Sequence, residues 1–281
     1  MARIITLITD FGISDGYVAS MKGVILSINP SAVIVDISHA VEPQYIRQAA
    51  FILHTSWRYF PESTIHVAVV DPEVGSSRKI VALKTPRAYF IAPDNGILSY
   101  ILYELAGGYK THSYPASNAT SKRPIPDGCE AITLTKEEYW RHPVSATFHG
   151  RDIFAPVAAH LSMDIPLSEL GEPVTQLHAF PVPEPFKDAM GRTVGHIIHI
   201  DRFGNLITNL RSKDIPREGA AVEIHNQRID NTAPYYSKST GLMAIIGGND
   251  YLELSVRNGS AADLLGARVG DTVTVHSRPH S

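Results

Sequence analysis

The sequence predicts a mixed α/β protein: an N-terminal α/β domain built on a parallel sheet, followed by a C-terminal all-β, barrel-like domain. In the first half, short buried apolar runs alternate with segments of helical periodicity, as in parallel strands joined by right-handed crossovers. After the proline-rich segment 181–186, short apolar runs follow one another closely without a long helix between them. We therefore expect an N-terminal domain over 1–180, a linker over 181–190 and a C-terminal domain over 191–281.

The first half supplies the parallel sheet. Buried strands are expected over Ile4–Ile8, Ala32–Ile37 and Thr64–Val70. Between them, apolar residues at helical spacing predict helices over Val18–Ile28, which Asn29-Pro30 ends, and Ile46–Trp57, which Phe60-Pro61 ends. Further along, the pattern predicts a hairpin over Ile80–Leu83 and Ala88–Ile91, a helix over Gly96–Leu105, proline-containing loops with at most one helical turn over Tyr109–Pro143, and a helix over Ile153–Leu161.

The second half is predicted to be all strand. The expected strands are Thr193–Ile200, Leu206–Asn209, Ala221–Ile224, Met243–Ile246, Tyr251–Val256 and Thr272–His276. Their short spacing favours a small barrel or sandwich.

Composition narrows the class of protein. With 44% apolar and 19% charged residues, the chain is typical of a globular enzyme, and a net charge of -3 gives no reason to expect nucleic acid or an anionic membrane as a partner. The lone Cys129 excludes an intrachain disulfide and a cysteine metal cluster, and no other metal-ligand spacing is visible. The N-terminus lacks the pattern of a signal peptide, and no apolar run is long enough to span a membrane. We expect a cytoplasmic protein.

The segment Val69–Arg78, VVDPEVGSSR, is the most informative stretch. An apolar strand ends at Asp71, and Pro72 and Gly75 then force a turn that brings Arg78 near the acid. This arrangement would place a carboxylate and a guanidinium at the mouth of a cleft, although a structural ion pair is an equal alternative. Asp10 and Asp36 also follow predicted strands, and three acids at one sheet edge suggest a ligand-binding cleft.

Two motifs of the first domain could contribute to that cleft. Asp10-Phe11-Gly12 is not a kinase motif, because the other kinase elements are absent. Either Asp10 holds ligand hydroxyls, such as a ribose diol, or this turn only precedes a helix that Ser14 or Asp15 caps.

The second motif is Thr147–Asp152, TFHGRD, which precedes a helix. An aromatic before His149 and a glycine after it favour a cleft position for this histidine. Arg151 and Asp152 are expected to form a capping or structural pair.

The second domain offers candidate nucleoside contacts. In Asp201–Asn205, DRFGN, Phe203 could stack on a planar ring and Asn205 could pair with an adenine edge, but the segment is equally compatible with a plain β-turn. Arg257-Asn258-Gly259 is favoured, taken alone, as a strand ending in a turn. The adjacent Tyr235 and Tyr236 are as compatible with packing as with ligand contact.

Taken together, TDFG, VDPxVG with Arg78, FHGRD, DRFGN and VRNGSAA, in this order, resemble the S-adenosyl-L-methionine hydroxide adenosyltransferases. These are relatives of the fluorinase and chlorinase, which displace methionine from S-adenosyl-L-methionine (SAM). The resemblance implies an α/β domain joined to a β-barrel and a homotrimer whose active sites lie between subunits. It implies no cofactor and no metal, with SAM as substrate and adenosine as product.

The resemblance also implies residue roles. Asp71, Arg78 and His149 match the catalytic set of the hydrolytic members. The residues implied in substrate binding are Asp10 at the ribose, Asp15 and Asp201 near the methionine amino group, and Phe203, Asn205, Tyr236, Arg257, Asn258 and Gly259 around the adenine. Thr147 and Phe148 are also expected to contact the substrate.

Departures from the halogenases indicate which nucleophile is used. Asp71 stands where the halogenases carry a tyrosine, Gly150 where the fluorinase has a serine that helps hold the halide, and Gln44 where it has a tryptophan. A carboxylate would repel a halide and can accept a proton from water. We therefore expect hydrolysis of SAM to adenosine and methionine. Arg78 close to Asp71 would lower the pKa of this acid and weaken it as a base. The residue that finally accepts the proton of the water could therefore be either Asp71 or His149. The alternatives are a SAM-dependent halogenase, a methyltransferase without the usual glycine-rich loop, or a SAM or adenosine sensor without turnover.

Overall fold

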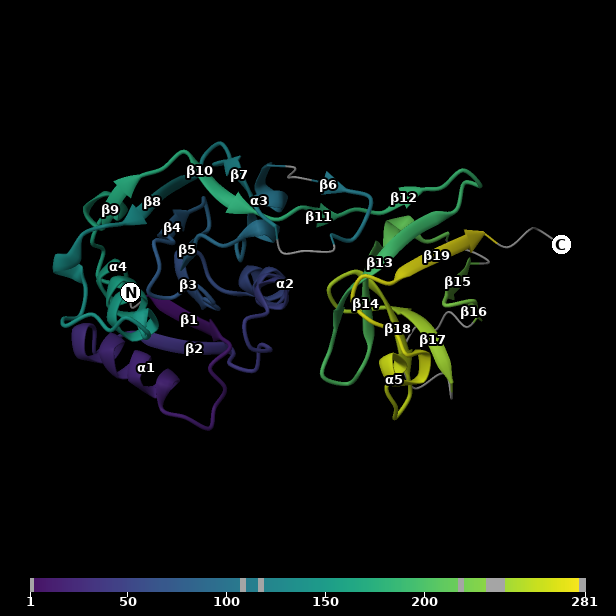
Figure 1. Ribbon diagram of the computed structural model, residues 1–281, viewed down its shortest axis with the longest axis horizontal. Helices are drawn as coiled ribbons and strands as arrows, with labels where there is room; N and C mark the ends of the chain where they lie inside the picture. The colour runs from purple at the N-terminus through teal and green to yellow at the C-terminus, as the bar shows by residue number, and fades with distance from the viewer. Residues whose placement is uncertain (1–2, 107–109, 116–118, 217–219, 231–240, 278–281) are drawn as a thin grey trace. The chain divides into compact units, whose positions relative to one another are not determined.

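The computed structural model of the 281-residue chain describes residues 3–106, 110–115, 119–216, 220–230 and 241–277 (Figure 1). The chain divides into two compact units. Unit 1 comprises Met1–Tyr109 and Asn118–Phe180, and unit 2 comprises Lys110–Ser117 and Pro181–Ser281.

Unit 1 is built on a seven-stranded sheet of order β2-β1-β3-β5-β4-β8-β9. Its strands are β1 (Ile4–Thr9), β2 (Val33–Ser38), β3 (Thr64–Val69), β4 (Ile80–Lys84), β5 (Ala88–Pro93), β8 (Glu130–Leu134) and β9 (Gly171–Pro173). The first four strands in that order are parallel, and β4, β8 and β9 add antiparallel pairings. The predicted parallel arrangement and the predicted β4–β5 hairpin are confirmed.

Helices cover both faces of this sheet. On one face, α1 (Tyr17–Ile28) and α4 (Ala155–Ser162) pack together over alternate residues of β1 and β3, including Ile5, Leu7 and Val67. On the other, α2 (Ile46–Ser56) is followed by Trp57, whose ring contacts His66 and Phe90, and α2 packs with α3 (Ser99–Ala106) (Figure 1). The side chains of alternate strand residues therefore pack into two apolar layers, one on each face, as expected of a sheet buried on both sides.

The prediction of loops over Tyr109–Pro143 is wrong in three places, the first of which is the two-residue strand β6 (Lys110–Thr111). Ser121–Pro124 forms β7, which pairs with β10 (Gln176–Ala179), and Glu130–Leu134 forms β8, which pairs with β4 inside the main sheet. Prolines near both segments argue against strands in the sequence, and the strands with which these segments pair lie far away along the chain. The expected helical turn is present as a 3-10 turn over Glu137–Tyr139.

Unit 2 contains an antiparallel sheet of order β16-β15-β19-β13-β14-β18-β17, with β12 paired to β13. Because the end strands β16 and β17 approach each other, the sheet is nearly closed, and the predicted barrel-like fold is confirmed. The strands are β13 (Thr193–Ile200), β14 (Leu206–Arg211), β15 (Ala220–Ile224), β16 (Gln227–Ile229), β17 (Leu242–Ile246), β18 (Tyr251–Val256) and β19 (Thr272–Ser277), with a short helix α5 (Ala261–Leu265).

The segment predicted as a linker, 181–190, is not free of regular structure. It holds the short strands β11 (Val182–Pro183) and β12 (Phe186–Lys187), and β11 pairs with β6 (Lys110–Thr111). Within the described residues, the helices are too short or too polar for any of them to cross a membrane.

Candidate active site

Asp71 and Arg78 form a close ion pair just beyond the carboxyl end of β3. Nε of Arg78 donates to Oδ1 of Asp71 at 3.0 Å and to Oδ2 at 2.7 Å, and Nη2 also contacts Oδ2. Both side chains are only 5% exposed. The predicted proximity of acid and guanidinium is therefore present. Oδ1 of Asp71, which accepts only from Nε, has a further lone pair with which it can accept another hydrogen bond.

His149 joins this pair through Arg78. Nη2 of Arg78 lies 2.8 Å from Nδ1 of His149. Because a guanidinium can only donate, Nδ1 must accept, and neutral His149 carries its proton on Nε2. Burial, and next the charge of Arg78, lower the pKa of His149, which favours this neutral form. The three residues thus form one chain of contacts, in which His149 can donate through Nε2.

Asp71 and His149, but not Arg78, line a cavity of about 390 Å³ in unit 1. Its lining comes from the turn after β1, the loop before α2, the loop after β3 and the turn before α4: Asp10, Phe11, Tyr17, Pro43, Gln44, Val69, Asp71, Pro72, Val74, Thr147, Phe148, His149 and Gly150. Five of the residues predicted at the site, Asp10, Asp71, Thr147, Phe148 and His149, line one cavity.

Asp10 is held in place by a backbone donor. Gln44 adopts a left-handed conformation with φ 63°, and its N–H donates to Oδ2 of Asp10 at 2.8 Å. This contact leaves Oδ1 of Asp10 for a ligand, as a carboxylate that binds a diol requires. Gln44 therefore orients this carboxylate through its backbone.

His149 precedes a π-helical turn, Gly150–Phe154, which leads directly into α4. Such turns occur frequently at functional sites. The fully buried Asp152 fixes this turn, because its carboxylate accepts from Nε and Nη2 of Arg151 at 2.7 and 2.8 Å and from the N–H of Ser145 at 2.9 Å. The predicted structural pair of Arg151 and Asp152 is confirmed.

Three aromatic rings form an apolar wall of the cavity. The centroids of Phe11 and Phe148 lie 5.8 Å apart, and that of Tyr17 lies 5.8 Å from Phe11 and 5.3 Å from Phe148. Tyr17 is 49% exposed and was not among the predicted site residues. The sequence signal that could have identified it is its position as the first residue of the helix that follows the Asp10 turn.

Two expectations for this region fail. Asp36 does not join the cavity, because it is engaged by Nζ of Lys22 at 2.6 Å and Nε2 of His39 at 3.0 Å. Neither Ser14 nor Asp15 caps α1, whose N-cap residue is Gly16 with no side-chain cap. Asp15 lies outside the lining of the cavity, and its carboxylate is 3.5 Å from the Ser14 hydroxyl.

In unit 2, Asp201 and Asn205 hold a turn together. Asp201 Oδ1 accepts from the N–H groups of Phe203 and Asn205 at 2.8 and 2.9 Å, and Oδ2 accepts from Nδ2 of Asn205 at 2.8 Å. The β-turn alternative is therefore correct for the backbone. Phe203 is 77% exposed, so its ring is available for stacking, whereas Asn205 is only 7% exposed.

A second turn lies against the first. Arg257, Asn258 and Gly259 are exposed and form the predicted turn after β18, with Asn258 at φ 57°. The turns meet because Gly204 lies so close to Ser260 that a Cβ at Gly204 would be 2.2 Å from the Ser260 hydroxyl. Unit 2 thus gathers the DRFGN and RNG motifs at one place. Tyr236 lies outside the described residues. Within the described residues, no three His, Cys, Asp or Glu side chains are grouped in a way that could hold a metal ion.

Comparisons with known proteins cover both units. Residues 5–171 match the family model of the SAM hydroxide adenosyltransferase N-terminal domain, and residues 195–274 match that of the C-terminal domain. The chain is 33% identical over 275 residues to the (R)-S-adenosyl-L-methionine hydrolase of Salinispora tropica, covering 96% of this chain and 97% of that protein.

A more distant relative and a solved structure are also similar to this chain over most of its length. The fluorinase of an Actinoplanes species is 30% identical over 242 residues, which cover 77% of this chain and 74% of the fluorinase. The crystal structure of an uncharacterized conserved protein from Thermotoga maritima superposes with a TM-score of 0.83 at 32% identity, covering 98% of this chain and all of that one.

Proposed function

Since this chain belongs to the SAM hydroxide adenosyltransferase family, we propose that it hydrolyses SAM and that Asp71, Arg78 and His149 act on the attacking water. The observation that carries the proposal is the contact chain Asp71–Arg78–His149 beside a cavity that also contains Asp10. A site that only bound SAM would not need this buried carboxylate, guanidinium and imidazole in mutual contact.

The proposed reaction is a displacement at the ribose C5′. The oxygen of a water forms a bond to C5′ while the C5′–S bond breaks, and the electron pair of that bond goes to sulfur. The sulfonium therefore leaves as the neutral thioether of methionine, and the other product is adenosine. Asp10, with its free Oδ1, would hold the ribose hydroxyls and fix C5′ relative to the water.

The attacking water must lose a proton, and Asp71 is the proposed acceptor. Nδ1 of His149 is already occupied by Arg78, so the imidazole offers the water a donor at Nε2 rather than a base. Asp71 can accept from the water with a remaining lone pair and then pass the proton to solvent. Arg78 would hold both partners and stabilise negative charge as the hydroxide forms.

The nucleophile follows from position 71. A buried carboxylate next to the proposed water position disfavours a halide there, because like charges repel in a site of low dielectric. We therefore assign water, and not fluoride or chloride, as the nucleophile. SAM is a substrate in this proposal, and the reaction needs no cofactor or metal. Activity is expected to survive dialysis against EDTA.

We further propose that the adenine and methionine ends are bound by Asp15, Asp201, Phe203, Asn205, Tyr236, Arg257, Asn258 and Gly259. The exposed ring of Phe203 supports a stacking role. A homotrimer with active sites between subunits is proposed from the family resemblance. Light scattering coupled to size exclusion tests it, and a monomer at assay concentration would contradict it.

One experiment tests the reaction. The purified protein is incubated with SAM, with and without chloride, and the products are separated by chromatography. We expect equal amounts of adenosine and methionine in both conditions. A 5′-halo-adenosine would indicate a halogenase, S-adenosylhomocysteine a methyltransferase, and unchanged SAM with measurable binding a sensor.

A further inference from the structure

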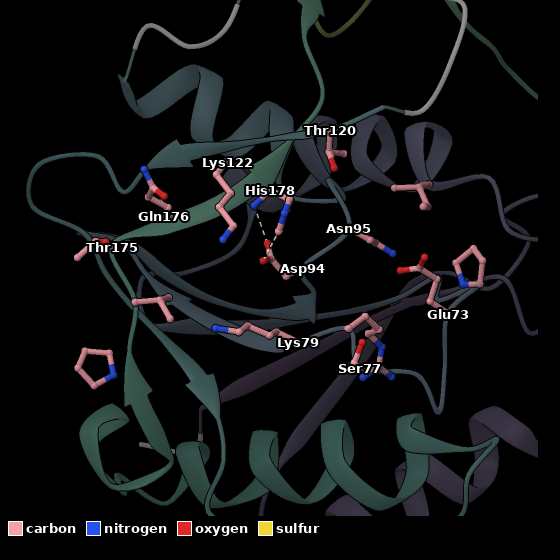
Figure 2. A pocket seen from close by; sticks show the side chains of 15 residues that line it. Glu73, Ser77, Lys79, Asp94, Asn95, Thr120, Lys122, Thr175, Gln176 and His178 are labelled. Atoms are coloured by element: carbon pink, nitrogen blue, oxygen red, sulfur yellow. Dashed lines mark hydrogen bonds and ion pairs between the residues drawn. The ribbon is translucent and has the colours of Figure 1, made fainter.

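Unit 1 contains a second and larger cavity, of about 790 Å³ (Figure 2). Pro72 lines both cavities, whereas Arg78 lines only the larger one. Most of the remaining lining comes from the end of β5, from the antiparallel pair of β7 and β10, and from the segment before β10. Its volume suits a small organic ligand.

A buried carboxylate orients a histidine in this cavity. Asp94, whose side chain is 7% exposed, accepts from the backbone N–H of His178 through Oδ1 at 2.7 Å and contacts Nδ1 of the same residue through Oδ2 at 2.7 Å (Figure 2). Because the carboxylate can only accept, Nδ1 carries a proton, and Nε2 is left for another partner. The imidazole is therefore fixed in tautomer and direction.

Two lysines reach the same cavity. Lys122 of β7 is the direct cross-strand neighbour of His178 on β10, so their side chains lie on the same face of this two-stranded sheet. Lys79 comes from the start of β4. In the part of the chain that the structure describes, neither ammonium group has an ion-pair or hydrogen-bond partner. The hydroxyls of Thr120 and Thr175 lie on the same lining, whereas Glu73 lies away from the lysines (Figure 2).

We propose that this cavity binds a phosphorylated small molecule, with a phosphoryl group between Lys79, Lys122 and Nε2 of His178. Donors from three separate elements on the lining of one cavity suit the tetrahedral oxygens of a phosphoryl group better than a planar carboxylate, and lysine is a common phosphate ligand. Nε2 of His178 can donate to a phosphoryl oxygen when the ring carries both protons, or accept from a protonated phosphoryl oxygen when it carries one. The site is separate from the proposed hydrolytic reaction and does not depend on it.

The test is calorimetric titration of the full-length protein with inorganic pyrophosphate at low ionic strength, in the presence of saturating adenosine. Adenosine keeps the anion away from the proposed SAM site. We expect saturable binding that weakens at least about tenfold in Lys122→Gln and further in the double variant with Lys79→Gln, because each change removes a charge-assisted contact. Lys136→Gln, which removes an exposed lysine of unit 1 outside the cavity, is the matched control and should bind like the wild type.

Several results would overturn the proposal. These are no binding of pyrophosphate up to about 10 mM, equal affinity of the wild type and the double variant, or citrate binding as tightly as pyrophosphate, which would exclude the phosphoryl assignment. His178→Asn, checked for a wild-type melting temperature, is an independent variant that should also bind pyrophosphate more weakly than the wild type. Hydrolysis of SAM should continue in Lys122→Gln, so a failure of the proposed reaction and a failure of this site give different results.

Discussion

Gly75 lies against the carbonyl oxygen of Ala146 so closely that a Cβ at position 75 would be 2.4 Å from it. Gly75 belongs to the loop that carries Arg78, and Ala146 belongs to the segment that leads to His149. This approach therefore joins the two loops whose side chains meet at the 2.8 Å contact of Arg78 and His149. Gly75 also has φ 82°, a conformation that other residues rarely adopt.

Replacement of Gly75 by alanine should lower kcat strongly, because both the close contact and the positive φ oppose a methyl group. We expect strain of about 1–3 kcal/mol, relieved by a shift of the loop that separates Arg78 from His149. Measurement of kcat and of the melting temperature checks this. The control is Gly23→Ala, in α1, where a Cβ meets nothing within 4 Å and stability should not fall. Unchanged kcat in Gly75→Ala would mean that the loop contact does not position the site.

Asp71→Asn should keep the binding of SAM but slow its hydrolysis by roughly 10² to 10⁴, the range for removal of a general base. The amide keeps the size of the side chain but cannot take the proton of the attacking water. Single-turnover rates and the affinity for adenosine separate the two effects. Wild-type turnover in this variant would show that Asp71 is not the proton acceptor.

Protonation of His149 should make kcat fall at acidic pH, which gives the pH profile of kcat an acid limb. Burial and the Arg78 charge lower the pKa of His149 from its usual 6.5, so the ring is neutral at and above that pH. As the pH falls through the lowered pKa, Nδ1 is protonated and can no longer accept from Arg78. We therefore expect kcat to be flat above about pH 6.5 and to fall below it.

His149→Gln should be slower than the wild type at neutral pH and lack this acid limb. Arg78→Met should raise the pKa of His149, as followed by NMR titration of the ring, because the positive charge that opposes protonation is gone. An unchanged histidine pKa in Arg78→Met would contradict the electrostatic link between the two side chains.

Local pattern predicted the parallel sheet because β1 and β3 are continuous apolar runs that end at acids and turn residues. The same reasoning missed β8, because Glu130–Leu134 is short, lies among prolines, and is buried only through its pairing with distant β4. Burial that depends on a remote partner leaves no periodic signal in the strand itself.

In the candidate site, too, residues marked by local sequence pattern were predicted, and residues whose role depends on contacts with distant segments were not. Asp71, Arg78 and His149 stood out because turn residues and a following glycine mark their segments. Tyr17 did not, because its contact with Phe148 depends on how the turn after β1 folds back. Asp36 was placed wrongly, because the sequence did not show that Lys22 and His39 would engage it.

Gly150→Ser tests whether position 71 or position 150 decides the nucleophile. A Cβ at Gly150 would lie 3.3 Å from both Sδ of Met21 and the ring of Phe11, so a serine must displace these neighbours slightly, and a modest loss of kcat is expected. The Asp71 carboxylate stays in this variant and still repels an anion, so no 5′-halo-adenosine should form when SAM is supplied with fluoride or chloride. Chromatography of the products, with Gly23→Ala treated in parallel, measures this. Halogenated product from Gly150→Ser alone would show that the missing serine, and not the carboxylate of Asp71, makes this protein a hydrolase.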